Sequence, residues 1–107
     1  MVRRNDIFWA DLGPEAGRRP VCIVTRDAAI EMLDRVTCAP ITRTIRGIPT
    51  EVEVGPSEGM PERAVISCDN LVTIGKARLD PQAIGRLGPS SRIELDRTLR
   101  YALDIIF

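Results

Sequence analysis

The sequence contains no histidine. Histidine is the side chain whose charge changes most readily near neutral pH, and it is the commonest protein ligand for metals. Its absence argues against zinc hydrolases and excludes enzymes that depend on a Ser-His-Asp triad. We therefore expect neither zinc-dependent hydrolysis nor triad chemistry. No cofactor is expected.

Cysteine is scarce as well. Cys22, Cys38 and Cys68 lie far apart, have no C-x-x-C spacing and leave an odd number. Each sits in an apolar stretch, which predicts small buried side chains in a reducing compartment. A disulfide framework is not expected.

Long apolar runs are missing too. No stretch approaches the roughly 18 residues of a membrane-spanning helix, and the N-terminal residues lack the apolar region and cleavage site of a secretion signal. We expect a cytoplasmic protein with no membrane association. Its 107 residues predict one domain over 1–107. The formal net charge of zero argues against a general nucleic-acid coat protein.

The pattern of apolar residues is mostly that of short strands. Alternating or continuous β-branched stretches predict strands at Ile7–Leu12, Pro20–Thr25, Val36–Ile41, Thr50–Val54, Ala64–Cys68 and Leu71–Ile74. A short helix fits Asp27–Leu33. This order predicts a mostly β fold, a small and strongly bent antiparallel sheet or SH3-like barrel, with a C-terminal helix.

The C-terminal part changes to a helical period. Ser91 and Glu94 have the spacing of a capping box. One apolar stripe follows at three- and four-residue intervals, formed by Leu95, Leu99, Ala102, Leu103 and Ile106. The stripe is wide for a helix that covers a small barrel. It therefore indicates a two-fold dimer, the alternative being that it covers only the chain's own core.

Two polar segments are not explained by strand packing. Gly17–Pro20 precedes one buried strand and Thr42–Gly47 follows another, and together they hold Arg18, Arg19, Thr42, Arg43, Thr44 and Arg46. Glu15 is the one acid inside either loop region. If the fold brings both together, they form a basic, phosphate-sized patch that could orient a nucleic-acid backbone. The alternative is a pair of solvated loops.

Seven sequence pieces occur in an order and at spacings that together are specific. They are RNDIFWADLGP (4–14), GRRPVCIV (17–24), APIT (39–42), PTEV (49–52), SCDN (67–70), IGKARL (74–79) and IGRL (84–87). Through them the chain resembles the MazF/PemK (Kid) family of growth-inhibiting toxins over nearly its whole length. It departs from the family's usual pattern at Asn5, where glycine is common, at Val72, where arginine is frequent, and in its short Gly13–Arg18 loop.

The resemblance implies a metal-independent endoribonuclease that cuts single-stranded RNA. Its catalytic residues would be Arg19 and Thr42, and the 2′-hydroxyl would attack phosphorus to leave a 2′,3′-cyclic phosphate and a 5′-hydroxyl. A guanidinium suits the charge that develops on the phosphate oxygens, and a threonine hydroxyl can hold one of them. Asp69 is a candidate catalytic or positioning residue. The RNA-binding residues would be Arg18, Arg43, Thr44 and Arg46.

The same resemblance implies partners. A homodimer and a cognate MazE-like antitoxin with a flexible, acidic tail are expected. Two alternatives share this fold: a non-enzymatic CcdB-like gyrase poison and an SH3-like adaptor without activity. Fold by itself does not separate the three, but Arg19 together with Thr42 favours the nuclease.

Overall fold

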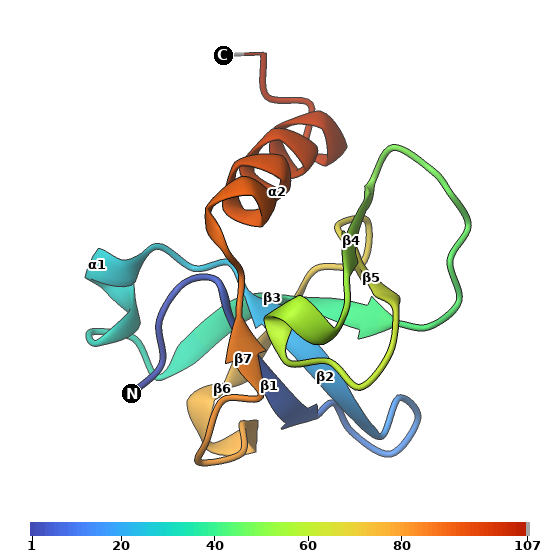
Figure 1. Cartoon of the computed structure of the whole chain (residues 1–107). Coiled ribbons are helices and arrows are strands. Elements are labelled where there is room, and N and C mark those ends of the chain that lie inside the picture. Colours follow the sequence, from blue (N-terminus) through green and yellow to red (C-terminus); the bar gives the residue numbers. More distant parts are fainter. Residues whose placement is uncertain (107) are drawn as a thin grey trace.

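The computed structural model describes residues 1–106, and its elements are shown in Figure 1. The strands are β1 (Asp6–Asp11), β2 (Arg18–Ile23), β3 (Arg35–Thr42), β4 (Glu51–Val54), β5 (Ala64–Ser67), β6 (Val72–Gly75) and β7 (Gly85–Arg86). The helices are α1 (Asp27–Ile30) and α2 (Pro89–Ala102), with short 3-10 turns η1 (Pro56–Glu58) and η2 (Lys76–Arg78). The prediction of a bent antiparallel sheet with a C-terminal helix is confirmed.

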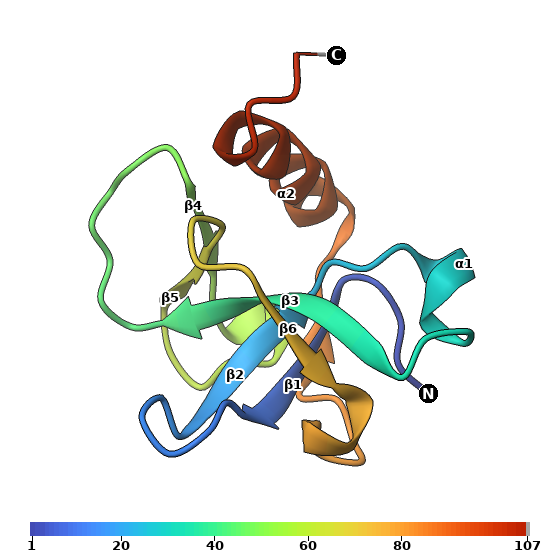
Figure 2. The same cartoon turned by 180° about the vertical axis from the view of Figure 1, so that it is seen from behind.

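Strand β3 joins the two parts of the sheet. The strand order is β4-β5-β3-β2-β1-β7, and every pair is antiparallel. The first half of β3 pairs with β6, whereas its last two residues pair with β5. Figure 2 shows β3 running across the molecule from the α1 side to the β5 side. The sheet therefore bends around this one strand, as a half-open barrel requires.

Both faces of the central strands are buried, as the continuous apolar stretches predict. Along β1, Ile7 packs into one core cluster and Phe8 into another on the opposite face. Helix α2 covers the first cluster with Leu95 and Leu99, which are 0% and 8% exposed. The helix lies above β4 and the sheet in Figure 1.

The three cysteines are free and buried, as predicted. Burial is the main reason that the thiol pKa of Cys22 rises to about 12 and that of Cys68 to about 11. These side chains act as small apolar groups in the core.

Two backbone positions need unusual conformational freedom. Asn5 has a φ of 76°, a conformation that asparagine tolerates better than most residues, so its replacement of the family's usual glycine is accommodated. Gly85 lies against the η1 turn: a Cβ there would be 2.0 Å from the carbonyl oxygen of Glu58. This close contact holds the chain that leads from η1 into β5.

The C-terminal helix differs from the prediction at both ends. Ser91 and Glu94 form no capping box, because α2 begins at Pro89 with Gly88 as its N-cap, and no side-chain hydrogen bond caps it within residues 1–106. Proline at the first helical position has its φ already set for a helix, so the helix starts before Ser91. It ends at Ala102, which leaves Leu103 and Ile106 of the stripe beyond it and 54% and 95% exposed.

Helix α1 is also shorter than expected: it ends at Ile30, and Glu31 and Met32 continue as a turn. Across residues 1–106, no helix is both long and apolar enough to cross a membrane.

Candidate active site

The register of β2 and β3 brings Arg19 and Thr42 together. These strands pair at Val21↔Pro40, Cys22↔Ala39 and Ile23↔Cys38. The same register, continued two residues further, sets Arg19 beside Thr42. Proline has no N–H to donate to a ladder, and the regular pairing stops at Pro40. The two side chains therefore lie where the strands no longer form a closed ladder.

A cavity of about 330 Å³ opens at this point. We call it the arginine pocket, and its lining residues are Trp9, Arg18, Arg19, Pro20, Ile41, Thr42, Arg43, Met60, Pro61, Glu62 and Ala64. The strands β1, β2 and β3 supply Trp9, Arg18, Arg19 and Thr42, and Arg43 directly follows β3. The segment between η1 and β5 closes the pocket and adds Glu62. The β1–β2 turn and the loop after β3 lie on the same side of the molecule in Figure 1.

Arg19 is the arginine of this pocket with no carboxylate partner among residues 1–106. Its Nε donates to the carbonyl oxygen of Ala16 at 3.0 Å. That bond fixes the plane of the guanidinium through one edge. The two Nη groups are left to donate to a ligand, and a phosphate is the ligand that a two-pronged guanidinium fits best.

Thr42 is held by the loop that follows it. The backbone N–H of Thr44 donates to Thr42 Oγ1 at 3.1 Å. Since the oxygen accepts this bond, the hydroxyl proton can point elsewhere and donate to an oxygen in the pocket. Thr44 thus acts on the site through its backbone, while its side chain is outside the lining of the pocket.

The other two arginines of the pocket are already paired. Both Nη atoms of Arg18 donate to the carboxylate of Asp80 at 2.9 Å, and this contact lowers the pKa of Asp80. Arg43 donates to Glu62 at 2.5 Å. The sequence predicted a basic patch with Glu15 as its one acid. That charge balance is wrong, because the fold brings Asp80 and Glu62 from distant segments to pair with Arg18 and Arg43.

Two of the predicted residues lie apart from the pocket. Arg46 is on the exposed loop, where its backbone N–H donates to Glu51. Asp69 accepts a hydrogen bond from Thr50 Oγ1 at 2.6 Å and lines a different hollow, beside the end of α2. Arg18, Arg19, Thr42 and Arg43 are thus brought together, whereas Arg46 and Asp69 are not.

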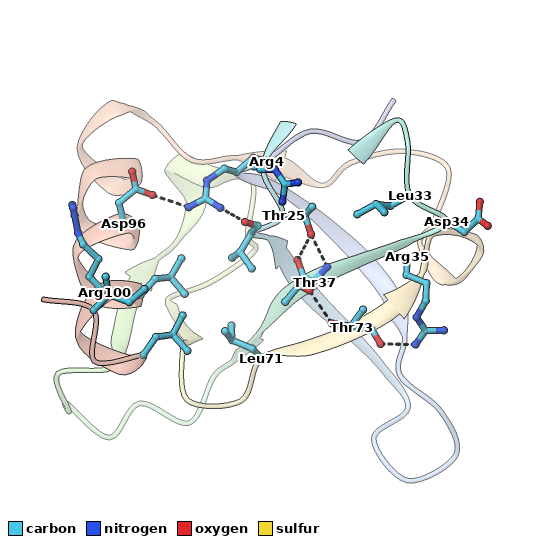
Figure 3. A pocket seen from close by; sticks show the side chains of 15 residues that line it. Arg4, Thr25, Leu33, Asp34, Arg35, Thr37, Leu71, Thr73, Asp96 and Arg100 are labelled. Carbon is cyan, nitrogen blue, oxygen red and sulfur yellow. Dashed lines mark hydrogen bonds and ion pairs between the residues drawn. The ribbon is translucent and has the colours of Figure 1, made fainter. Parts of the chain in front are cut away.

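A second, larger hollow of about 910 Å³ lies between α2 and the β3–β6 pair. We call it the helix-side groove, and it is shown in Figure 3. Its lining residues are Arg4, Val24, Thr25, Arg26, Leu33, Asp34, Arg35, Thr37, Leu71, Thr73, Asp96, Leu99, Arg100, Leu103 and Ile105. Most of its polar groups are bonded to one another: Arg4 pairs with Asp96, and Thr37 bonds Thr25 and Thr73.

Trp9, Glu62 and Asp80 are the pocket neighbours that sequence reasoning missed. The strand pattern could have indicated Trp9. Residues that lie opposite each other in an antiparallel pair point to the same face of the sheet, and Trp9 lies opposite Pro20, which also lines the pocket. Glu62 and Asp80 carry no comparable signal, because neither lies in a strand. Residues 1–106 contain no group of three or more cysteines and acidic residues that could hold a metal ion.

Comparison with known protein families identifies the fold and its class. Residues 3–103 match the family of PemK-like, MazF-like toxins of type II toxin-antitoxin systems. The chain belongs to this family. The match includes every residue that lines the arginine pocket.

Individual relatives agree with this membership. The chain is 37% identical to the probable endoribonuclease MazF5 of Mycobacterium tuberculosis over 95% of its own length and 89% of that protein. The structure superposes on the M. tuberculosis toxin MazF-mt6 with a TM-score of 0.87, at 38% identity, over 95% of this chain and 99% of the other. A mycobacterial endoribonuclease in complex with its cognate antitoxin gives a TM-score of 0.88 at 29% identity, over 100% and 99% of the two chains.

Proposed function

We propose that this toxin is a sequence-selective, ribosome-independent endoribonuclease that cuts single-stranded RNA and thereby inhibits translation and growth. The observation that carries the proposal is the position of Arg19 beside Thr42, with the Nη groups of Arg19 directed to no carboxylate within residues 1–106. Its relatives are named endoribonucleases, which favours this reading over the gyrase-poison alternative.

The chemistry follows from what these two side chains can do. The 2′-oxygen of the RNA forms a bond to the neighbouring phosphorus as its hydroxyl loses a proton. The bond to the 5′-oxygen breaks, and that oxygen takes up a proton. Negative charge gathers on the non-bridging oxygens during the exchange, where Arg19 stabilises it and the Thr42 hydroxyl holds one oxygen in place. The products are a 2′,3′-cyclic phosphate and a 5′-hydroxyl.

The proposed roles of the remaining residues follow from their contacts. A guanidinium stays protonated in proteins, so Arg19 is a charge stabiliser and not a general base. Arg18 and Arg43 border the RNA site, and the loop with Thr44 and Arg46 extends it. Asp69 does not line the arginine pocket of its own chain, and its catalytic or positioning role stays a prediction.

The decisive experiment uses purified protein and a long single-stranded RNA in the presence of EDTA. Cleavage should persist, because the sequence has no histidine and residues 1–106 offer no cluster of metal ligands. RNA with a 2′-deoxy sugar at the cut site should resist cleavage, since the nucleophile is gone. Mapping both ends should give a cyclic phosphate and a 5′-hydroxyl. If the protein leaves RNA intact and inhibits DNA gyrase instead, it is a gyrase poison and the endoribonuclease assignment is wrong.

We further propose that two copies associate through the helix-side groove. Leu33, Leu103 and Ile105 line this face and are 46%, 54% and 41% exposed. Clustered apolar side chains of this size are unusual on the free surface of a monomer. The continuation of the chain after α2, and not the helix stripe alone, supplies the apolar part of the interface.

The proposed antitoxin partner covers the loops around the arginine pocket with an acidic, flexible tail. Carboxylates on such a tail would compete with Glu62 for Arg43 and attract the exposed Arg46. Changing Arg43 and Arg46 to serine should weaken the antitoxin complex and reduce its salt dependence. Unchanged affinity and salt dependence would place the antitoxin elsewhere.

A further inference from the structure

Trp9 is the single tryptophan of the chain, and it is not placed as a core residue. Its neighbours on β1, Phe8 and Ala10, are 2% and 0% exposed, whereas Trp9 is 38% exposed. Trp9 is one of the residues that line the arginine pocket, together with Arg19 and Thr42. A large aromatic ring is therefore presented at the site where phosphate chemistry is proposed.

Arg18 covers part of this ring. Its guanidinium carbon lies 5.5 Å from the centroid of the Trp9 ring, within the range of a cation–π interaction. Both Nη atoms are held by Asp80, so the donors that would grip a phosphate are occupied. The Arg18 side chain nevertheless remains 57% exposed. What it offers to a ligand is its flat face and not its polar edge.

We propose that Trp9 and Arg18, with Asp80 holding the guanidinium in place, form a stacking platform for a nucleobase next to the phosphate bound at Arg19 and Thr42. The proposal rests on the proposed function. It departs from the expectation that Arg18 binds phosphate. Base stacking on aromatic rings and on guanidinium planes is how single-stranded RNA is commonly held.

The position of the platform suits a base adjacent to the cut. Trp9 lies directly opposite Pro20 in the β1–β2 ladder, and Arg19 follows Arg18 in the chain. One ligand can therefore reach both the platform and Arg19 within a single cavity. An acidic peptide would find the Arg18 charge already neutralised by Asp80, which favours a nucleobase over a protein segment.

The fluorescence of Trp9 shows whether a ligand occupies the platform, because the chain has no other tryptophan. The probes are a mixed-sequence single-stranded octamer with 2′-fluoro sugars, which cannot be cut, and an abasic octamer with the same backbone. The base-containing octamer should quench the emission of Trp9. The abasic octamer should bind more weakly and leave the emission nearly unchanged. Equal quenching by the two would overturn the platform.

Substitutions test the same point by the anisotropy of a labelled octamer. Trp9→Leu should weaken binding of the base-containing octamer about 5- to 150-fold and leave binding of the abasic octamer as in the unmodified protein. Trp9→Phe should retain most of the affinity. Asp80→Asn releases the Arg18 guanidinium to bind phosphate, so the abasic octamer should bind about two- to fivefold more tightly, while the preference for the base-containing octamer should fall. A Trp9→Leu protein that is folded by circular dichroism and binds both octamers unchanged would overturn the proposal.

RNA cleavage and the stacking platform can be tested separately. If the unmodified protein does not cut RNA, the proposed function fails, whatever Trp9 does. If RNA is cut but Trp9→Leu leaves KM unchanged, the nuclease stands and the platform fails. An acidic peptide of the kind proposed for the antitoxin tail should keep its affinity in Trp9→Leu, because its proposed contacts are Arg43 and Arg46. If Trp9→Leu weakens the peptide as much as the base-containing octamer, the surface recognises protein segments and the nucleobase assignment is wrong.

Discussion

The arginine pocket and the helix-side groove differ in a way that volume does not reflect. The groove is nearly three times larger, at about 910 Å³ against about 330 Å³. Both cavities hold arginines without a carboxylate partner within residues 1–106: Arg26, Arg35 and Arg100 in the groove and Arg19 in the pocket. In the groove they lie with the exposed Leu33, Leu103 and Ile105, whereas in the pocket Arg19 lies with Thr42. Exposed apolar side chains, and neither size nor free charge alone, therefore distinguish the proposed interface from the proposed site for an anionic substrate.

The largest expected effect is in the smaller cavity. Arg19→Ala should lower the cleavage rate by about 10²-fold or more, as for loss of one preorganised donor to the transition state. The fold should be unchanged, because Arg19 is exposed and makes one hydrogen bond to Ala16. Single-turnover cleavage and thermal unfolding measure the two quantities. Arg97→Ala, on the exposed side of α2, is the matched control and should cut RNA normally.

A charge introduced into the helix-side groove should mainly weaken association of the two copies. Leu103→Asp should weaken the proposed dimer about 30-fold or more, because it buries a carboxylate among apolar side chains at a contact centre. Sedimentation at micromolar concentration should then give a monomer. Glu94→Asp, on the exposed face of α2, is the control. A Leu103→Asp protein with an unaltered sedimentation coefficient would place the interface on another face.

An intermediate effect is expected at Thr42. Thr42→Ala should reduce kcat about tenfold, the typical loss when one hydrogen bond to a charged group is removed. Thr42→Ser keeps the hydroxyl and should recover most of the rate. If serine does not restore cleavage, the methyl group and not the hydroxyl accounts for the loss.

The smallest effect concerns the ion pair at the mouth of the arginine pocket. Glu62→Gln frees Arg43, and RNA affinity should rise about two- to fivefold, in keeping with the modest strength of exposed ion pairs. The slope of affinity against salt concentration should become steeper by about one phosphate contact. Glu53→Gln frees Arg63 instead, outside the pocket, and should leave both quantities unchanged.

Periodicity predicts local structure well and long-range charge pairing poorly. The strand pattern predicted β2 and β3, and their antiparallel register is enough to bring Arg19 to Thr42. No sequence pattern joins Arg18 to Asp80, which are 62 residues apart, because exposed ion pairs are not constrained by burial. The start of α2 was misread for a local reason: Pro89 initiates the helix before the polar pair that resembled a capping box.

Helix α2 is made last among the elements of residues 1–106, although the fold of the arginine pocket depends on it. Every residue lining the arginine pocket is made before residue 65, but the core beneath the pocket is completed by Leu95 and Leu99, and β1 gains its outer partner at Gly85–Arg86. A nascent chain that has emerged only as far as the pocket residues exposes an open apolar face and has no stable sheet. We therefore expect a nascent chain to cut no RNA until α2 has packed onto the sheet.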